Sequence, residues 1–188
     1  IYNMLLKFTT AERIAASETS IIDGLIYRAL FPDEAAALDQ SFEMSAYIGT
    51  KALASRYNSD KAHSEFVEKY ALKIFDKTQR LHRMGPRERL FLRLAAILHD
   101  TGKFISIRNH YYHSYEIIRD SEIPGLDSRD MEIIANIARY HSSAVPSAND
   151  EGYGRFDHET RMVISRLSSI LRMAEALDKG HAKKFEDI

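Results

Sequence analysis

The 188-residue sequence predicts an all-α fold, a helical bundle, preceded by a short segment of different character. Apolar residues recur at helical spacing along most of the chain. Asp60, Asp127 and Asp157 stand where helix N-caps are expected, and glycine and proline separate the helical stretches. With 45% hydrophobic residues, the chain can bury one good core.

Composition excludes several function classes. The formal net charge of −1 gives no global reason to expect a nucleic-acid or membrane partner, and we expect neither. The absence of cysteine excludes disulfides, thiolate metal sites and cysteine nucleophiles. It also fits a reducing compartment, so we expect a cytoplasmic protein. The sequence shows no signal peptide and no long uncharged apolar segment.

Residues 1–31 have a different pattern of expected secondary structure from the rest of the chain. Residues 4–8 are typical of a helix end, residues 13–17 of a short strand, and Ser20 offers an N-cap for a helix over 21–31. Such a segment cannot close a sheet by itself, so we expect it to be the remnant of an α/β domain. Because the chain starts at Ile1 rather than at methionine, we expect a piece of a longer protein.

The main body, residues 32–188, is expected to be helical almost throughout. Pro32 ends the preceding helix and opens an alanine-rich one over residues 33–57. Asp60 caps a helix to about Met84, and Pro86 starts the central helix, which runs to His99. Further helices are predicted over residues 113–121, 127–141 and 157–179, with a polar loop before the last. No solenoid repeat is present.

The central helix ends in a chemically distinctive stretch. An apolar run leads into His99 and Asp100, and Gly102 then permits an unusual backbone turn. An imidazole and a carboxylate held at the end of a buried helix make half of a divalent-metal site. The alternative is a capped helix end or a surface ion pair, which is the commoner role of such a dipeptide.

Other helices offer partners for this pair. His63 lies on the apolar face of its helix, and His141 continues the apolar stripe of residues 131–138. Asp178 lies on the same helix face as Leu171 and Ala174, which is expected to face the core. A carboxylate buried there needs a charged partner or a metal ion. Each of these three residues alone is typical of a hydrogen-bonded core residue. Together with His99 and Asp100 they predict a metal site.

His63, the pair His99–Asp100 and Asp178 resemble the H…HD…D signature of the HD-domain metal-dependent phosphohydrolases. The resemblance implies that these four residues bind a divalent metal, which activates water against a phosphate ester. Ligand chemistry allows manganese, magnesium, iron, nickel or zinc.

A narrower resemblance extends over nearly the whole chain. It points to the C-terminal part of the exopolyphosphatase/guanosine pentaphosphate phosphatase (Ppx/GppA) family. It rests on residues 85–89, 104–106, 113–115, 118–125 and 138–141. Residues 1–31 are similar to the tail of that family's actin-like (ribonuclease H-like) domain, which implies actin-like domains of the same full-length chain as partners. The family's polyphosphate-cleaving site lies between those domains, and some members use the helical domain as a dimer contact.

Catalytic roles are expected for Asp100, Lys103 and His113. Lys103 is expected to bind the negatively charged phosphate. The alternative is that it is an ordinary cation at the C-terminal end of a helix. His113 would donate a proton or, with His141, hold a second metal; His110 is the weaker candidate. Arg108 and Arg119 flank the expected site as phosphate-binding candidates.

Two hypotheses of function remain open. The first is an HD-type phosphohydrolase domain acting on or binding polyphosphate or guanosine polyphosphates. The second is a non-catalytic polyanion-binding and dimerisation module with a structural metal, which would form a homodimer. Basic residues around the turn at Gly85 could guide such a polyanion, although charge runs are usually solvated faces.

Overall fold

The computed structural model describes residues 20–142 and 144–178, and within them it contains helices and no strand. The predicted all-α class is therefore confirmed for the described chain. The helix end expected over residues 4–8 and the strand expected over 13–17 lie outside the described residues. No helix of the described part is long and apolar enough to cross a membrane.

The described residues divide into two compact units, the first ending at Ser41 and the second starting at Phe42. The first contains α2 (Ile21–Leu30) and the start of α3 (Pro32–Arg56). The Ser20 hydroxyl accepts from Asp23 N, while the Asp23 carboxylate accepts from Ser20 N, which closes a capping box. Arg28 pairs with Asp39 through two hydrogen bonds of 2.8 and 2.9 Å.

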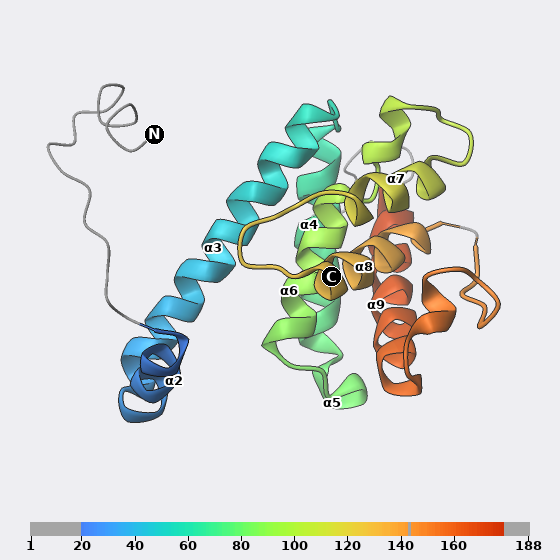
Figure 1. Cartoon of the computed structure of the whole chain (residues 1–188). Coiled ribbons are helices and arrows are strands. Elements are labelled where there is room, and N and C mark those ends of the chain that lie inside the picture. Colours follow the sequence, from blue (N-terminus) through green and yellow to red (C-terminus); the bar gives the residue numbers. More distant parts are fainter. Residues whose placement is uncertain (1–19, 143, 179–188) are drawn as a thin grey trace, which may run out of the picture. The chain divides into compact units, whose positions relative to one another are not determined.

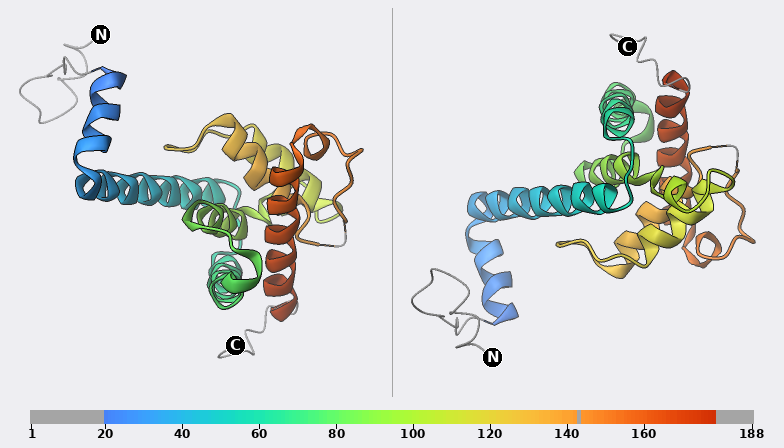
Figure 2. Two further views of the ribbon diagram at one scale, coloured as in Figure 1. Left: turned by 90° about the horizontal axis from the view of Figure 1, so that it is seen from below. Right: turned by 90° about the horizontal axis from the view of Figure 1, so that it is seen from above.

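The second unit is a helical bundle (Figure 1). The end of α3 is followed by α4 (Lys61–Lys77), α5 (Gln79–His82), α6 (Pro86–Leu98), the 3₁₀ turn η1 (Thr101–Phe104), α7 (His110–Arg119), α8 (Ser128–Arg139), the 3₁₀ turn η2 (Tyr153–Arg155) and α9 (His158–Leu177). Helix α6 packs against α4, α8 and α9. Figure 2 shows α4 nearly end-on and α9 along its length, so α9 crosses α4.

Helix α6 is the centre of the core. Its residues Leu92, Leu94, Ala95, Ala96 and Leu98 have no solvent-exposed surface. Full burial of a leucine side chain contributes on the order of 1.5–3 kcal/mol, so these residues fix α6 firmly against its neighbours. The helix ends at Leu98, and the two polar residues that follow it are held at a rigid position.

Two helix boundaries differ from the predicted ones. The helix expected to run from Asp60 to Met84 breaks at Thr78, whose hydroxyl donates to Ile74 O, and α5 follows separately. Helix α7 starts at His110 rather than His113, because Asn109 adopts a left-handed backbone conformation with φ of 56° just before it. This earlier start places His110 in the first turn of α7.

Candidate metal centre

His99 and Asp100 lie at the C-terminal end of α6, where the chain turns into η1. Both side chains are buried, at 0% and 6% exposure. Ser114 braces this turn: its hydroxyl accepts from Gly102 N at 2.9 Å and donates to His99 O at 2.6 Å. Gly102 is required for this approach, since a Cβ atom there would lie 2.0 Å from His110 O. These contacts hold η1 directly against α7.

His63, on α4, faces two carboxylates of α9. Its Nδ1 lies 2.9 Å from Asp178 Oδ2, and its Nε2 lies 2.9 Å from Glu175 Oε2. A neutral imidazole carries a single N–H and can donate to only one of these carboxylates. The second contact needs an additional positive charge, which is either a proton or a metal ion.

His99 also lies too close to Glu175 for a neutral ring with no metal. Its Nδ1 lies 2.8 Å from Ala96 O, a contact in which the nitrogen must donate. The Nε2 atom of a neutral His99 then carries a lone pair, yet it lies 3.1 Å from Glu175 Oε2. Glu175 Oε2 is thus shared by the Nε2 atoms of two histidines, and these contacts need additional positive charge, either as protons on the rings or as a metal ion.

The pKa values of the two histidines follow from this arrangement. Burial by itself lowers the pKa of His63, but hydrogen bonds to Glu175 and Asp178 outweigh it and raise the pKa to about 9. Burial also lowers the pKa of His99, and the nearby Asp100 and Glu175 carboxylates outweigh it, so the net shift is upward. Without a metal, the site holds its positive charge as protons.

His141 and His110 extend the cluster toward α7 and α8. Burial and the neighbouring His99 lower the pKa of His141 to about 3. Its Nδ1 donates to Ala138 O at 2.6 Å, so the Nε2 atom of this neutral ring carries a lone pair, the form that binds metals. His110 Nε2 lies 3.1 Å from His141 Nε2 and 3.3 Å from Asp100 Oδ1.

Asp100 lies between these groups. Its Oδ2 is 3.7 Å from His63 Nε2 and 3.5 Å from His99 Nε2, and it pairs with the Lys103 ammonium. Its buried Oδ1 accepts no hydrogen bond from any residue that the structure describes. The pKa of Asp100 is nevertheless lowered: burial raises it, but His99 and Lys103 outweigh burial. An ionised, buried and partly unsatisfied carboxylate oxygen is a fitting metal ligand.

The donor atoms fall into two overlapping groups. His63, His99 and Glu175 form one, and His99, Asp100 and His141 form the other; in each, the candidate ligand atoms lie within 4.8 Å of one another. If the histidines are neutral, the carboxylates of Asp100, Glu175 and Asp178 carry three negative charges. Lys103 neutralises one of them, which leaves a net charge of −2. One divalent cation would balance this charge, so the residues present fit a metal.

The structure brings together most of the predicted site residues. His63, His99, Asp100 and Lys103 meet at the cluster, and His141 lies beside it. Asp178 contacts the Nδ1 atom of His63, on the opposite side of the ring from the Nε2 atom that faces Glu175 and Asp100.

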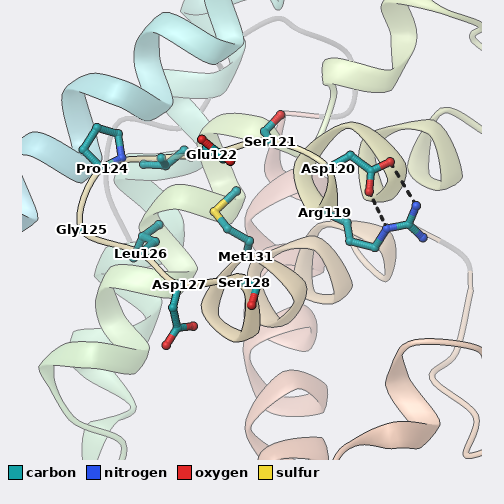
Figure 3. Close-up of a pocket in the computed structure, with 11 residues that line it drawn as sticks. Arg119, Asp120, Ser121, Glu122, Pro124, Gly125, Leu126, Asp127, Ser128 and Met131 are labelled. Carbon is teal, nitrogen blue, oxygen red and sulfur yellow. Dashed lines mark hydrogen bonds and ion pairs between the residues drawn. The ribbon is translucent and has the colours of Figure 1, made fainter.

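Neither candidate metal group contains the remaining predicted residues. His113 contacts the ring of Tyr112, and neither candidate metal group contains it. Arg108 is exposed. Arg119 pairs with Glu116 and Asp120 and lines a different hollow of about 690 Å³ between α7 and α8 (Figure 3). No residue of the histidine–carboxylate cluster lines that hollow, so its size does not make it the site.

Sequence reasoning missed Glu175 and ranked His110 low. Glu175 stands three residues before Asp178, so both project from the same side of α9, and this spacing was the available signal. The sequence favours His113 over His110, but with the early start of α7 the Nε2 atom of His110 lies 3.3 Å from Asp100 Oδ1.

Asp100 and Lys103 also line a cavity of about 240 Å³, which gives the cluster access to solvent. The other lining residues come from the α3–α4 connection and η1: Tyr57, Asn58, Ser59, Asp60 and Phe104.

Three of the arginines near Gly85 are paired with carboxylates. Arg87 donates to both carboxylate oxygens of Asp130 at 2.7 and 2.9 Å. Arg89 pairs with Asp76 at 2.7 Å, and Arg93 pairs with Glu68 at 2.7 Å. These three arginines hold helices together, so they offer less free positive charge to a polyanion than the sequence alone suggests.

The fold and the site thus define an all-α domain with a buried histidine–carboxylate cluster suited to a divalent metal. The sequence matches the family Ppx/GppA phosphatase, domain III, over residues 48–187, and the chain belongs to this family. It is similar to the guanosine-5′-triphosphate,3′-diphosphate pyrophosphatases of Aeromonas hydrophila and Aeromonas salmonicida, each 32% identical over 85 residues. These alignments cover 45% of this chain and 17% of each relative, so the chain matches only a small part of those proteins.

Proposed function

We propose that residues 32–188 form an HD-type metal-dependent phosphohydrolase domain that acts on phosphate esters of the polyphosphate or guanosine polyphosphate class. One observation carries the proposal. Two histidine Nε2 atoms, those of His63 and His99, lie 2.9 and 3.1 Å from the same oxygen of Glu175, an arrangement that needs added positive charge and that a divalent metal would supply. Membership of a phosphatase family and the names of the Aeromonas relatives support the choice of substrate class.

His63, His99, Asp100 and Glu175 would hold the metal, and His141 is placed to hold it or a second ion. When bound, a divalent metal lowers the pKa of a coordinated water and polarises a phosphoryl oxygen. In this proposal Asp178 orients His63 through its Nδ1 atom, a role that carboxylates commonly have behind metal-binding histidines. Residues 1–31 would belong to an actin-like domain of the same full-length chain.

The remaining polar residues have roles in holding phosphate and moving protons. The Lys103 side chain is 36% exposed at the 240 Å³ cavity, so its ammonium can contact a phosphate there while remaining near Asp100. His110, with its side chain 19% exposed, lies beside both Asp100 and His141 and is the better placed proton donor to a leaving oxygen. His113 lies outside this group and keeps only a supporting role.

The alternative is a non-catalytic polyanion-binding and dimerisation module with a structural metal. The ion pairs of Arg87, Arg89 and Arg93 weigh against it, because these residues offer little free positive charge to a polyanion. A buried, charged cluster also costs stability that an apolar core would not, which favours a chemical role for it.

The test is phosphate release from a panel of phosphomonoesters, phosphodiesters, polyphosphate and a guanosine polyphosphate, with manganese, magnesium, iron or nickel. We expect turnover that a chelator abolishes and that His99→Ala lacks. Arg155→Ala, whose exposed side chain pairs with Glu151, is the matched control and should retain turnover. No turnover on any substrate, together with tight metal-independent binding of polyphosphate, would favour the binding module.

A further inference from the structure

Arg172 of α9 is a partly buried cation that pairs with no carboxylate of the described residues. One of its terminal nitrogens donates instead to two backbone carbonyls, Tyr140 O at 3.0 Å and Ala144 O at 2.8 Å. The Nε atom is buried and has no hydrogen-bond partner in the part of the chain that the structure describes. Desolvating a guanidinium without an anionic partner costs free energy, and the two carbonyl contacts are what this arrangement provides.

These two carbonyls stand on either side of His141 in the chain. Tyr140 is the C-cap of α8, and its carbonyl belongs to the peptide group that joins it to His141. The N–H of the same peptide group donates to Ala138 O at 3.3 Å. Because a peptide group is planar, holding both its oxygen and its nitrogen fixes the plane from which the His141 side chain projects.

The His141 ring points from this peptide group into the histidine–carboxylate cluster. It meets the His99 ring edge to face, with centroids 4.9 Å apart, and forms one candidate metal group with His99 and Asp100. Arg172 stands three residues before Glu175, which belongs to the other candidate group. Helix α9 therefore carries a candidate ligand and also holds the segment that carries His141.

We propose that Arg172 is a positioning residue of the metal centre, which sets His141 relative to Glu175 by binding the carbonyls on both sides of His141. The inference rests on the proposed function for the presence of a metal. The alternative is that Arg172 only caps α8, since a cation at a helix C-terminus stabilises the helix. That alternative predicts a loss of stability but no dependence on the His141 imidazole.

The test is a double-mutant cycle measured by manganese titration calorimetry on the full chain. It compares the wild type with Arg172→Met, His141→Ala and the variant that carries both substitutions. We expect Arg172→Met to weaken manganese binding by about 10- to 100-fold, the usual effect of losing a group that orients a metal ligand. In the His141→Ala background the same substitution should cost no further affinity, because no imidazole is left to position.

Arg172→Lys should restore most of the affinity, since an ammonium can also donate to both carbonyls. If Arg172→Met does not fold, Arg172→Gln takes its place in the cycle. Arg166→Met is the matched control, because Arg166 is an exposed arginine of the same helix that donates to another backbone carbonyl, His82 O, at 3.4 Å. It should leave manganese affinity unchanged.

Two results would overturn the inference: wild-type manganese affinity in Arg172→Met, or the same loss from this substitution with and without His141. Either result, in a protein that binds manganese and releases phosphate, would leave the proposed phosphohydrolase intact. Conversely, the expected cycle in a protein that hydrolyses no phosphate ester would support the role of Arg172 and remove the proposed function.

Discussion

Asp178 Oδ2 lies 2.9 Å from His63 Nδ1, while the opposite ring nitrogen of His63 faces Glu175. The two carboxylates of α9 therefore contact one imidazole from two sides. This relationship separates their expected roles: Glu175 is placed to bind a cation together with His63, and Asp178 is placed to fix the ring's orientation.

Substitutions at these two positions should differ in severity. Glu175→Ala removes the carboxylate that His63 and His99 share, so we expect loss of tight metal binding and of turnover. Asp178→Asn keeps the shape of the orienting group and should weaken metal affinity by about 10- to 100-fold, with activity restored by excess metal. Titration calorimetry with manganese measures both effects. Equal losses in the two variants would show that Asp178 is itself an essential ligand.

Gly102→Ala should destabilise the protein. A Cβ atom at this position would lie 2.0 Å from His110 O and 2.4 Å from Ser114 N, and both are backbone atoms that cannot move without displacing α7. We expect a loss of about 1–3 kcal/mol or more in the free energy of unfolding, measured by urea denaturation. Gly24→Ala is the control, since a Cβ atom there meets nothing within 4 Å and its helix should tolerate alanine. A stable Gly102→Ala variant would contradict the tight packing of η1 on α7.

The metal-free protein should lose stability as the pH rises. The pKa of His63 is about 9 in the folded chain against an ordinary value of 6.5. Its contribution is therefore fully present below pH 6.5 and is lost as the pH rises through about 9. The loss should be a few kcal/mol at most, because a tenfold change in proton affinity is worth about 1.4 kcal/mol. Denaturation curves in chelator between pH 6 and 10 measure it.

The Asp178→Asn variant provides the comparison for this pH dependence. It removes one of the three carboxylates that raise the pKa of His63, so its stability should vary less over the same range. An identical slope in the two proteins would mean that another group is responsible.

The helices were predictable because their apolar spacing and their Asp caps are local features of the sequence. The break at Thr78, where the threonine hydroxyl bonds back to Ile74 O, has no glycine or proline to mark it in the sequence. Likewise, the inward faces of α4 and α9 identified His63 and Asp178, but periodicity cannot tell which nitrogen of a ring faces which carboxylate. The role of Glu175 depends on that orientation, and it becomes visible only when the helices are packed together.

The most direct test of the central claim is an anomalous diffraction map of crystals grown with manganese. We predict a strong peak within coordination distance of His63, His99, Asp100 and Glu175, with Asp178 at the Nδ1 atom of His63 and outside coordination distance of the peak. A map with no peak at this cluster, under conditions where manganese supports phosphate release, would contradict the account.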